Sequence, residues 1–128
     1  MNKKKHIKLW VIEKYNQYSK ERKLLAILNS RLNYDKVIFA MKILMMGDST
    51  SYSEILNVHL YKKNELEYPH QYLKYPIIIA GNSQYYKAPY RAWIADFNRE
   101  SGKYTDIEIS LKKYQEQHIS INQSSSHS

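Results

Sequence analysis

The chain has 128 residues, no cysteine and a formal net charge of +8 at pH 7. This length suits a single domain with its own core, and the lack of cysteine excludes disulfides, thiol nucleophiles and cysteine-ligated zinc. Three widely separated glycines exclude a phosphate loop and a dinucleotide fingerprint, and the five histidines show no i, i+4 pair. We therefore expect neither a cofactor nor a metal.

The positive charge is concentrated at the start of the chain. Residues 1–31 hold nine lysines and arginines against two glutamates, whereas the remaining residues hold eleven against ten. Local basic charge is typical of a surface that binds phosphates or an acidic partner.

The first third reads as helix. Apolar side chains follow 3.6-residue spacing, and no glycine or proline occurs before Gly47. A break near Ser19 or near Asn29 would divide so long a run. A short first strand over Ile7–Ile12 is the alternative. The apolar residues of the stripe are Ile7, Val11, Tyr15, Tyr18, Leu25, Leu28 and Leu32.

Two further segments precede the middle of the chain. Residues 36–46, with Asp35 as a cap, are apolar almost all round, which fits a buried helix or a central strand. Gly47 follows as a helix C′ residue. Ser51 and Glu54 then form a capping box ahead of a predicted helix over 51–63.

The second half contains all three prolines, which disfavour long helices. We predict strands over 77–80 and 90–97, and alternating apolar and polar residues predict a third over 105–111. The fold class is therefore α+β, with N-terminal helices packed on one face of a small antiparallel sheet, a three-stranded meander. Residues 1–121 form one domain, and residues 122–128 a disordered tail.

No segment is apolar for the ~20 residues that a membrane-spanning helix needs, and charged residues interrupt any secretory signal. We therefore expect a cytoplasmic protein without membrane contact. Frequent Ile, Lys, Asn and Tyr share A/T-rich codons, which suggests a viral, plasmid or low-GC bacterial origin.

Tyrosine is abundant, with 13 in the chain, and many in segment 52–90 stand beside lysine or arginine. Aromatic faces alternating with cations suit single-stranded nucleic acid. Half-buried tyrosines in ordinary packing, or a protein-binding surface in segment 52–90, are the alternatives.

The segment from Tyr90 to Phe97, a polar loop, residues 104–111 and then Lys112-Lys113-Tyr114 resemble the final hairpin of RelE/ParE-type toxins. The resemblance implies metal-independent, ribosome-dependent mRNA cleavage, or gyrase poisoning. Arg91 and Lys112 or Lys113 would stabilise charge at the scissile phosphate, and Tyr114 would orient or activate the 2′-hydroxyl.

The favoured function is non-enzymatic binding of nucleic acid or nucleoprotein through an N-terminal basic helix. The alternatives are a RelE-like endonuclease toxin and a protein-binding inhibitor or structural component. The predicted nucleic-acid-binding residues are Lys3, Lys4, Lys5, Lys8, Lys14, Lys20, Arg22, Lys23, Arg31, Lys62 and Lys63.

Overall fold

The computed structural model describes residues 5–48, 50–62, 65, 74–81, 87–107, 109–110, 112–113 and 116. Five antiparallel strands form one sheet in the order β2-β1-β5-β4-β3. The named elements are β1 (His6–Tyr15), β2 (Arg22–Asn29), α1 (Tyr34–Gly47), α2 (Tyr52–Leu56), β3 (Val58–Tyr61), β4 (Ile77–Ala80) and β5 (Tyr90–Asn98).

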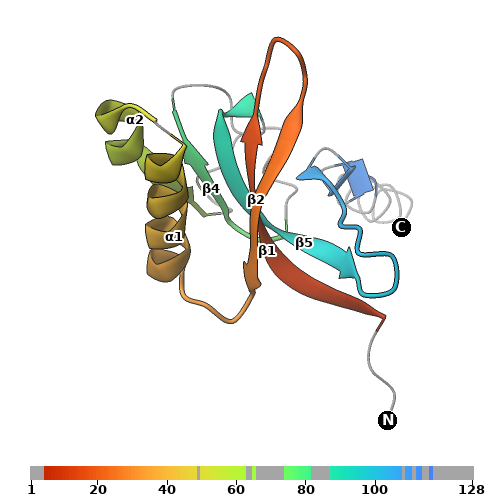
Figure 1. Ribbon diagram of the computed structural model, residues 1–128. Coiled ribbons are helices and arrows are strands. Elements are labelled where there is room, and N and C mark those ends of the chain that lie inside the picture. The colour runs from red at the N-terminus through yellow and green to blue at the C-terminus, as the bar shows by residue number, and fades with distance from the viewer. Residues whose placement is uncertain are drawn as a thin grey trace, which may run out of the picture.

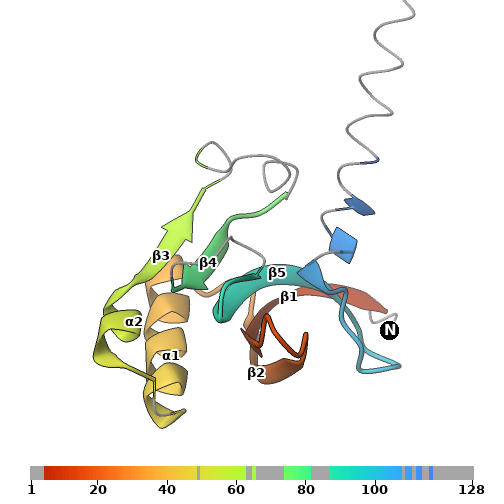
Figure 2. The same cartoon turned by 90° about the horizontal axis from the view of Figure 1, so that it is seen from above.

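The class α+β is confirmed, but the predicted arrangement is wrong in detail. The sheet has five strands rather than three, and two of them precede the helices. Helices α1 and α2 lie on one side of the sheet, and the helical residues described after β5 (107, 109–110 and 112–113) lie on the other (Figures 1 and 2).

The predicted N-terminal helix is wrong, and the strand alternative is confirmed. Residues 6–29 form a hairpin, and its turn is closed by Asn16, whose Oδ1 accepts from the backbone N–H of Tyr18 at 2.9 Å. Strand β1 is central, so Trp10, Val11 and Ile12 are all buried, on alternating faces. In a strand that is covered on both faces, apolar residues do not alternate with polar ones. The apolar residues of β1 therefore fit the 3.6-residue spacing of a helix by coincidence.

The β1–β2 ladder contains one irregularity. Ile12 pairs with Ala26 but Glu13 pairs with Leu24, which leaves Leu25 as an extra residue of β2. Such a bulge reverses the faces of the residues on one side of it relative to those on the other side. Arg22 therefore lies on the same face as Glu13, to which it is ion-paired.

Helix α1 confirms the helical interpretation of residues 36–46. Its N-cap is Asn33 rather than the predicted Asp35, because the Asn33 side chain accepts from the Lys36 backbone N–H at 3.0 Å. Gly47 is its last helical residue, and Asp48 is the C-cap.

The predicted helix over 51–63 is wrong beyond Leu56. Ser51 caps α2 as expected, since its Oγ accepts from the Glu54 backbone N–H at 3.4 Å. The chain then turns at Asn57 and pairs as β3 with β4, because Val58 and Leu60 pack into the core of the sheet.

The strand predicted over 105–111 is also wrong. Ile107, Ile109 and Ser110 are helical, and the Asp106 carboxylate accepts from the Ile109 backbone N–H at 2.8 Å, as in a helix cap. Among the described residues of this segment, Ile107 and Ser110, three residues apart, are buried. The strands predicted over 77–80 and 90–97 are confirmed as β4 and β5. The predicted tail 122–128 lies outside the described residues.

Two apolar clusters cover the two faces of the sheet. Trp10, Ile12 and Ile78 pack against Val37 and Met41 of α1. The opposite face is covered by Ala88 and Ile107, and its strand residues are Val11, Ile77, Ile79, Trp93 and Ala95.

Candidate nucleic-acid interface

A cleft of about 800 Å³ lies beside the first residues of β1, just beyond the end of β2. The β1–β5 ladder runs to His6 paired with Asn98, whereas the β1–β2 ladder stops at Leu9 paired with Asn29. The first residues of β1 thus have a neighbouring strand on one side only. The charged and ionisable side chains in the cleft lining are His6, Lys8, Arg31, Asp96 and Arg99.

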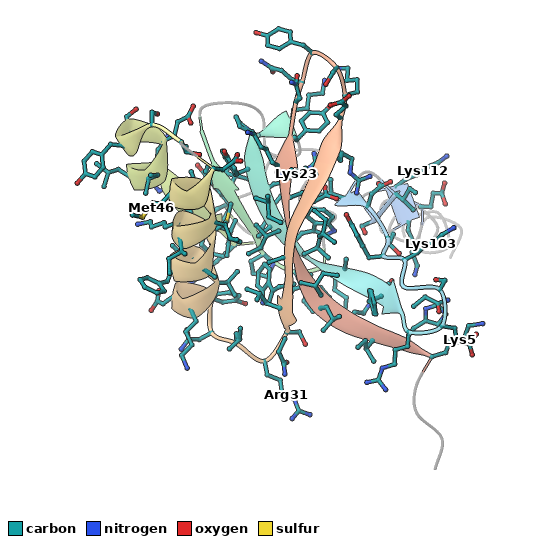
Figure 3. All side chains as sticks on the ribbon, viewed as in Figure 1. Lys5, Lys23, Arg31, Met46, Lys103 and Lys112 are labelled. Carbon is teal, nitrogen blue, oxygen red and sulfur yellow. The ribbon has the colours of Figure 1, made fainter. Side chains whose placement is uncertain are left out.

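Two short turns place Arg31 and Arg99 at the cleft. After β2, the Asn29 side chain accepts from the Arg31 backbone N–H at 2.9 Å. After β5, the Arg99 backbone N–H donates to the Lys5 carbonyl at 2.9 Å, and the Asn98 side chain accepts from two N–H groups of the following turn. Both arginines are exposed, and Arg31 projects from one end of the molecule (Figure 3).

The cleft has an excess of positive charge. Lys8 is hydrogen-bonded and ion-paired to Asp96, and Lys113 approaches the same carboxylate at 3.5 Å. Burial alone would raise the pKa of Asp96, but the hydrogen bond and charge of Lys8, together with Lys113, lower it. Within the described part of the chain, the guanidinium groups of Arg31 and Arg99 have no carboxylate partner. They are therefore free to bind an anion.

At the other end of the hairpin, the predicted contact residue Lys14 is neutralised within the protein. Its Nζ lies 2.6 Å from Asp48 Oδ2, and the Tyr90 hydroxyl donates to that oxygen at 2.7 Å. The hydrogen bond to Asp48 raises the pKa of Lys14, and the hydrogen bonds from Lys14 and Tyr90 lower the pKa of Asp48. Lys14 is thus a link between β1 and the end of α1.

The other predicted basic residues are scattered. Lys5 lies 3.5 Å from Glu100, and Lys20 and Lys23 are exposed on the hairpin. Lys62 is exposed after β3. Three predicted contact residues lie outside the described residues: Lys3, Lys4 and Lys63.

Arg91, predicted to act at a scissile phosphate, is only 1% exposed. Its Nη2 donates to Glu13 Oε1 at 3.2 Å, and its guanidinium lies 4.4 Å from the centre of the Tyr15 ring. Glu13 also accepts from Arg22 Nη2 at 2.7 Å and from the Tyr104 hydroxyl. We call Glu13, Arg22, Arg91 and Tyr104 the Glu13 cluster.

Burial and the contacts with Glu13 together shift the pKa values of Arg91, Tyr104 and Arg22. Burial lowers the pKa of Arg91 by more than the neighbouring Glu13 raises it. Burial, and then the hydrogen bond to Glu13, raise the pKa of Tyr104 to about 12. For Arg22, the hydrogen bond and charge of Glu13 outweigh burial and raise the pKa.

The predicted catalytic residues have separate partners. Lys113 approaches Asp96, whereas Arg91 is bound to Glu13. Asp96 and Arg91 are five residues apart on one strand, which is about 17 Å. Lys112 is exposed, and Tyr114 lies outside the described residues.

Sequence reasoning missed several residues of the cleft and of the Glu13 cluster, among them Glu13, Asp96 and Arg99. Glu13 stands directly after the apolar run Trp10–Ile12, and a charge beside a buried run was the available signal. Arg99 and Asp96 gave no signal, because the proximity of β5 to the start of β1 is a property of the sheet order.

Among the residues that the structure describes, no group of histidines and carboxylates could hold a metal ion, and no helix is long and apolar enough to cross a membrane. No protein-family model, curated protein or solved structure matches the chain.

Proposed function

We propose that the protein binds nucleic acid, with phosphates held in the cleft at the start of β1. The observation that carries this proposal is the pair of unneutralised guanidinium groups, Arg31 and Arg99, at a concave site of about 800 Å³. Arginine binds phosphate through two parallel N–H donors, and a cleft of this volume accepts a ligand the size of a nucleotide.

The neighbouring residues support the same function. His6 offers a ring nitrogen and a flat face, and Lys8 adds a cation beside Asp96. The phosphate-binding surface is thus the open end of a β-hairpin, where the sequence had suggested a helix.

Salt-dependent binding tests the proposal. Labelled single- and double-stranded RNA and DNA would be titrated at rising salt, and each phosphate contact contributes roughly 0.7–0.9 to the slope of log K against log[salt]. Replacing both Arg31→Gln and Arg99→Gln should reduce the slope by about 1.4–1.8. The control is the double variant Lys20→Gln and Lys62→Gln, which loses the same charge elsewhere.

Two results would contradict the proposal. One is affinity that does not weaken with salt for any of the four nucleic acids. The other is an equal effect of the two double variants, because the protein would then attract nucleic acid by its net charge alone.

The endonuclease function implied by the RelE/ParE resemblance stays a prediction. The buried ion pair between Arg91 and Glu13 does not favour it, since a catalytic guanidinium must reach the phosphate. Growth of cells that express the protein, compared with cells that express Arg91→Ala, tests it.

A further inference from the structure

Helix α1 carries an apolar stripe on the side that faces away from the sheet. Phe39, Ile43 and Met46 are 66%, 51% and 64% exposed. Spacings of four and three residues put these side chains on one helical face. The opposite face holds the buried residues Val37, Met41 and Met45.

Helix α2 enlarges this apolar surface. It packs next to α1, and its Tyr52 and Leu56 are 75% and 57% exposed. Six of the nine exposed large apolar side chains among the described residues belong to these two helices. Met46 lies at the opposite side of the molecule from Lys103 and Lys112 (Figure 3).

We propose that α1 packs antiparallel against α1 of a second copy of this chain, with a two-fold axis beside Ile43. A two-fold interface uses the same patch on both copies, so the patch must complement itself. With a rise of about 1.5 Å per residue, Phe39 lies roughly 6 Å before Ile43 and Met46 roughly 4.5 Å after it. Phe39 of each copy thus meets Met46 of the other, and methionine sulfur packs favourably against aromatic rings.

The charges at the ends of α1 fit the antiparallel direction. The last turn of α1 has no basic residue, so the negative end of the helix dipole has no side-chain cation from its own helix. The first turn holds both Asp35 and Lys36, and both are exposed; at the positive end of the dipole Asp35 is favourably placed within its own helix and Lys36 is not. In the antiparallel pair, Lys36 of each copy lies beside the carbonyl end of the other helix, where a cation is stabilising.

The size of the patch also suits a second copy. The five side chains Phe39, Ile43, Met46, Tyr52 and Leu56 are 51–75% exposed, which is on the order of 500 Å² of apolar surface, taking roughly 150–250 Å² for an aromatic side chain and somewhat less for an aliphatic one. Patches of that size on a monomer are often functional. When the polar residues around the patch are included, the surface area buried on each copy approaches the roughly 800 Å² per partner of a standard interface.

Cross-linking tests the contact and its register, because the chain has no native cysteine. Under mild oxidation, Ile43→Cys should form a disulfide-linked dimer, since the two-fold axis brings the two positions together. Phe39→Cys on the same face should not, because the two copies of that position lie about 12 Å apart along the helix, beyond the reach of a disulfide. Tyr18→Cys, at the exposed tip of the hairpin, is the second control.

Light scattering after size exclusion, over a dilution series, gives the oligomeric state of the unmodified protein. We expect a dimer that Ile43→Glu converts to a monomer and that Tyr18→Glu leaves intact, with circular dichroism showing that both variants are folded. A monomeric unmodified protein would overturn the proposal, whether or not α1 binds another protein. A dimer that cross-links through Phe39→Cys and not through Ile43→Cys would overturn it as well.

Discussion

The carboxylate of Glu13 and the guanidinium of Arg91 face each other across paired positions of β1 and β5, 3.2 Å apart and each 1% exposed. Arg22 and Tyr104 bind the same carboxylate from β2 and from the segment after β5. One buried side chain therefore joins three parts of the protein that are far apart in the chain.

Replacing Glu13 by glutamine should destabilise the protein strongly. The change leaves the Arg91 charge buried without a counter-charge, and loss of one partner of a buried ion pair costs about 3–5 kcal/mol. Urea unfolding measures the loss, and Glu21→Gln, in the exposed turn of the hairpin, should stay within about 0.5 kcal/mol. Equal stability of the two variants would mean that the Glu13 cluster contributes little to folding.

The Tyr104 hydroxyl should make stability depend on alkaline pH. Its pKa is raised from 10.0 to about 12 in the folded protein. The stabilisation is therefore fully present below pH 10 and is lost as the pH rises through 12. Between pH 10 and about pH 12, the free energy of unfolding should fall less steeply with pH for Tyr104→Phe than for the unmodified protein. Tyr18→Phe, whose ring is 88% exposed, should leave the slope unchanged.

Replacing Gly81 by alanine should destabilise the protein, whereas replacing Gly47 by alanine should stabilise it. Gly81 has φ +100, and an added Cβ would lie 2.9 Å from Pro89 Cδ, so Gly81→Ala should cost more than about 1 kcal/mol. Gly47 is helical with no atom within 4 Å of the added Cβ, so Gly47→Ala should gain about 0.5–1 kcal/mol. Thermal unfolding of both variants checks the pair, and a stabilised Gly81→Ala would contradict this account of the turn after β4.

Removing the Asp96 carboxylate should strengthen nucleic-acid binding. Asp96→Asn removes the negative charge from the cleft lining, where Lys8 and Lys113 contact it, so the salt slope should become steeper. Asp48→Asn, which frees Lys14 at the far end of the hairpin, should change cleft binding less. If the two variants act equally, the phosphates are not bound at the cleft.

The Asp96→Asn variant should also respond differently to acid from the unmodified protein. The pKa of Asp96 lies below the ordinary 3.8, so its stabilisation is present above pH 3.8 and is lost as the pH falls through the folded-state pKa. Asp96→Asn should therefore lose less stability than the unmodified protein when the pH is lowered from neutral to below 3.8. Acid unfolding curves of the two proteins, recorded by circular dichroism, measure the difference.

The sequence predicted best those elements whose local signals agree with their packing. β4 is a short apolar run before Gly81, and α2 begins at a capping serine. Prediction failed where tertiary packing decides. β1 is buried on both faces, so its apolar spacing carries no strand period, and Asp106 caps a helical turn inside an alternating pattern.

The candidate cleft was only partly predictable. Arg31 and Lys8 belong to the basic first 31 residues and were predicted as contacts. Arg99 was not, because its place beside His6 depends on the pairing of the first strand with the last. Arg91 was predicted as catalytic from the resemblance to RelE/ParE-type toxins, but the strand register directs it onto Glu13.

The extra residue Leu25 affects how this chain aligns with a homologous sequence. Counting back from Leu28 and Ala26, which face α1, an unbroken strand would direct Arg22 toward α1 as well. The bulge sends it to the opposite face, where Arg22 reaches Glu13. A homologous chain without a residue equivalent to Leu25 can therefore keep the ion pair between Arg22 and Glu13. A sequence alignment must place a gap at Leu25 to match the two arginines.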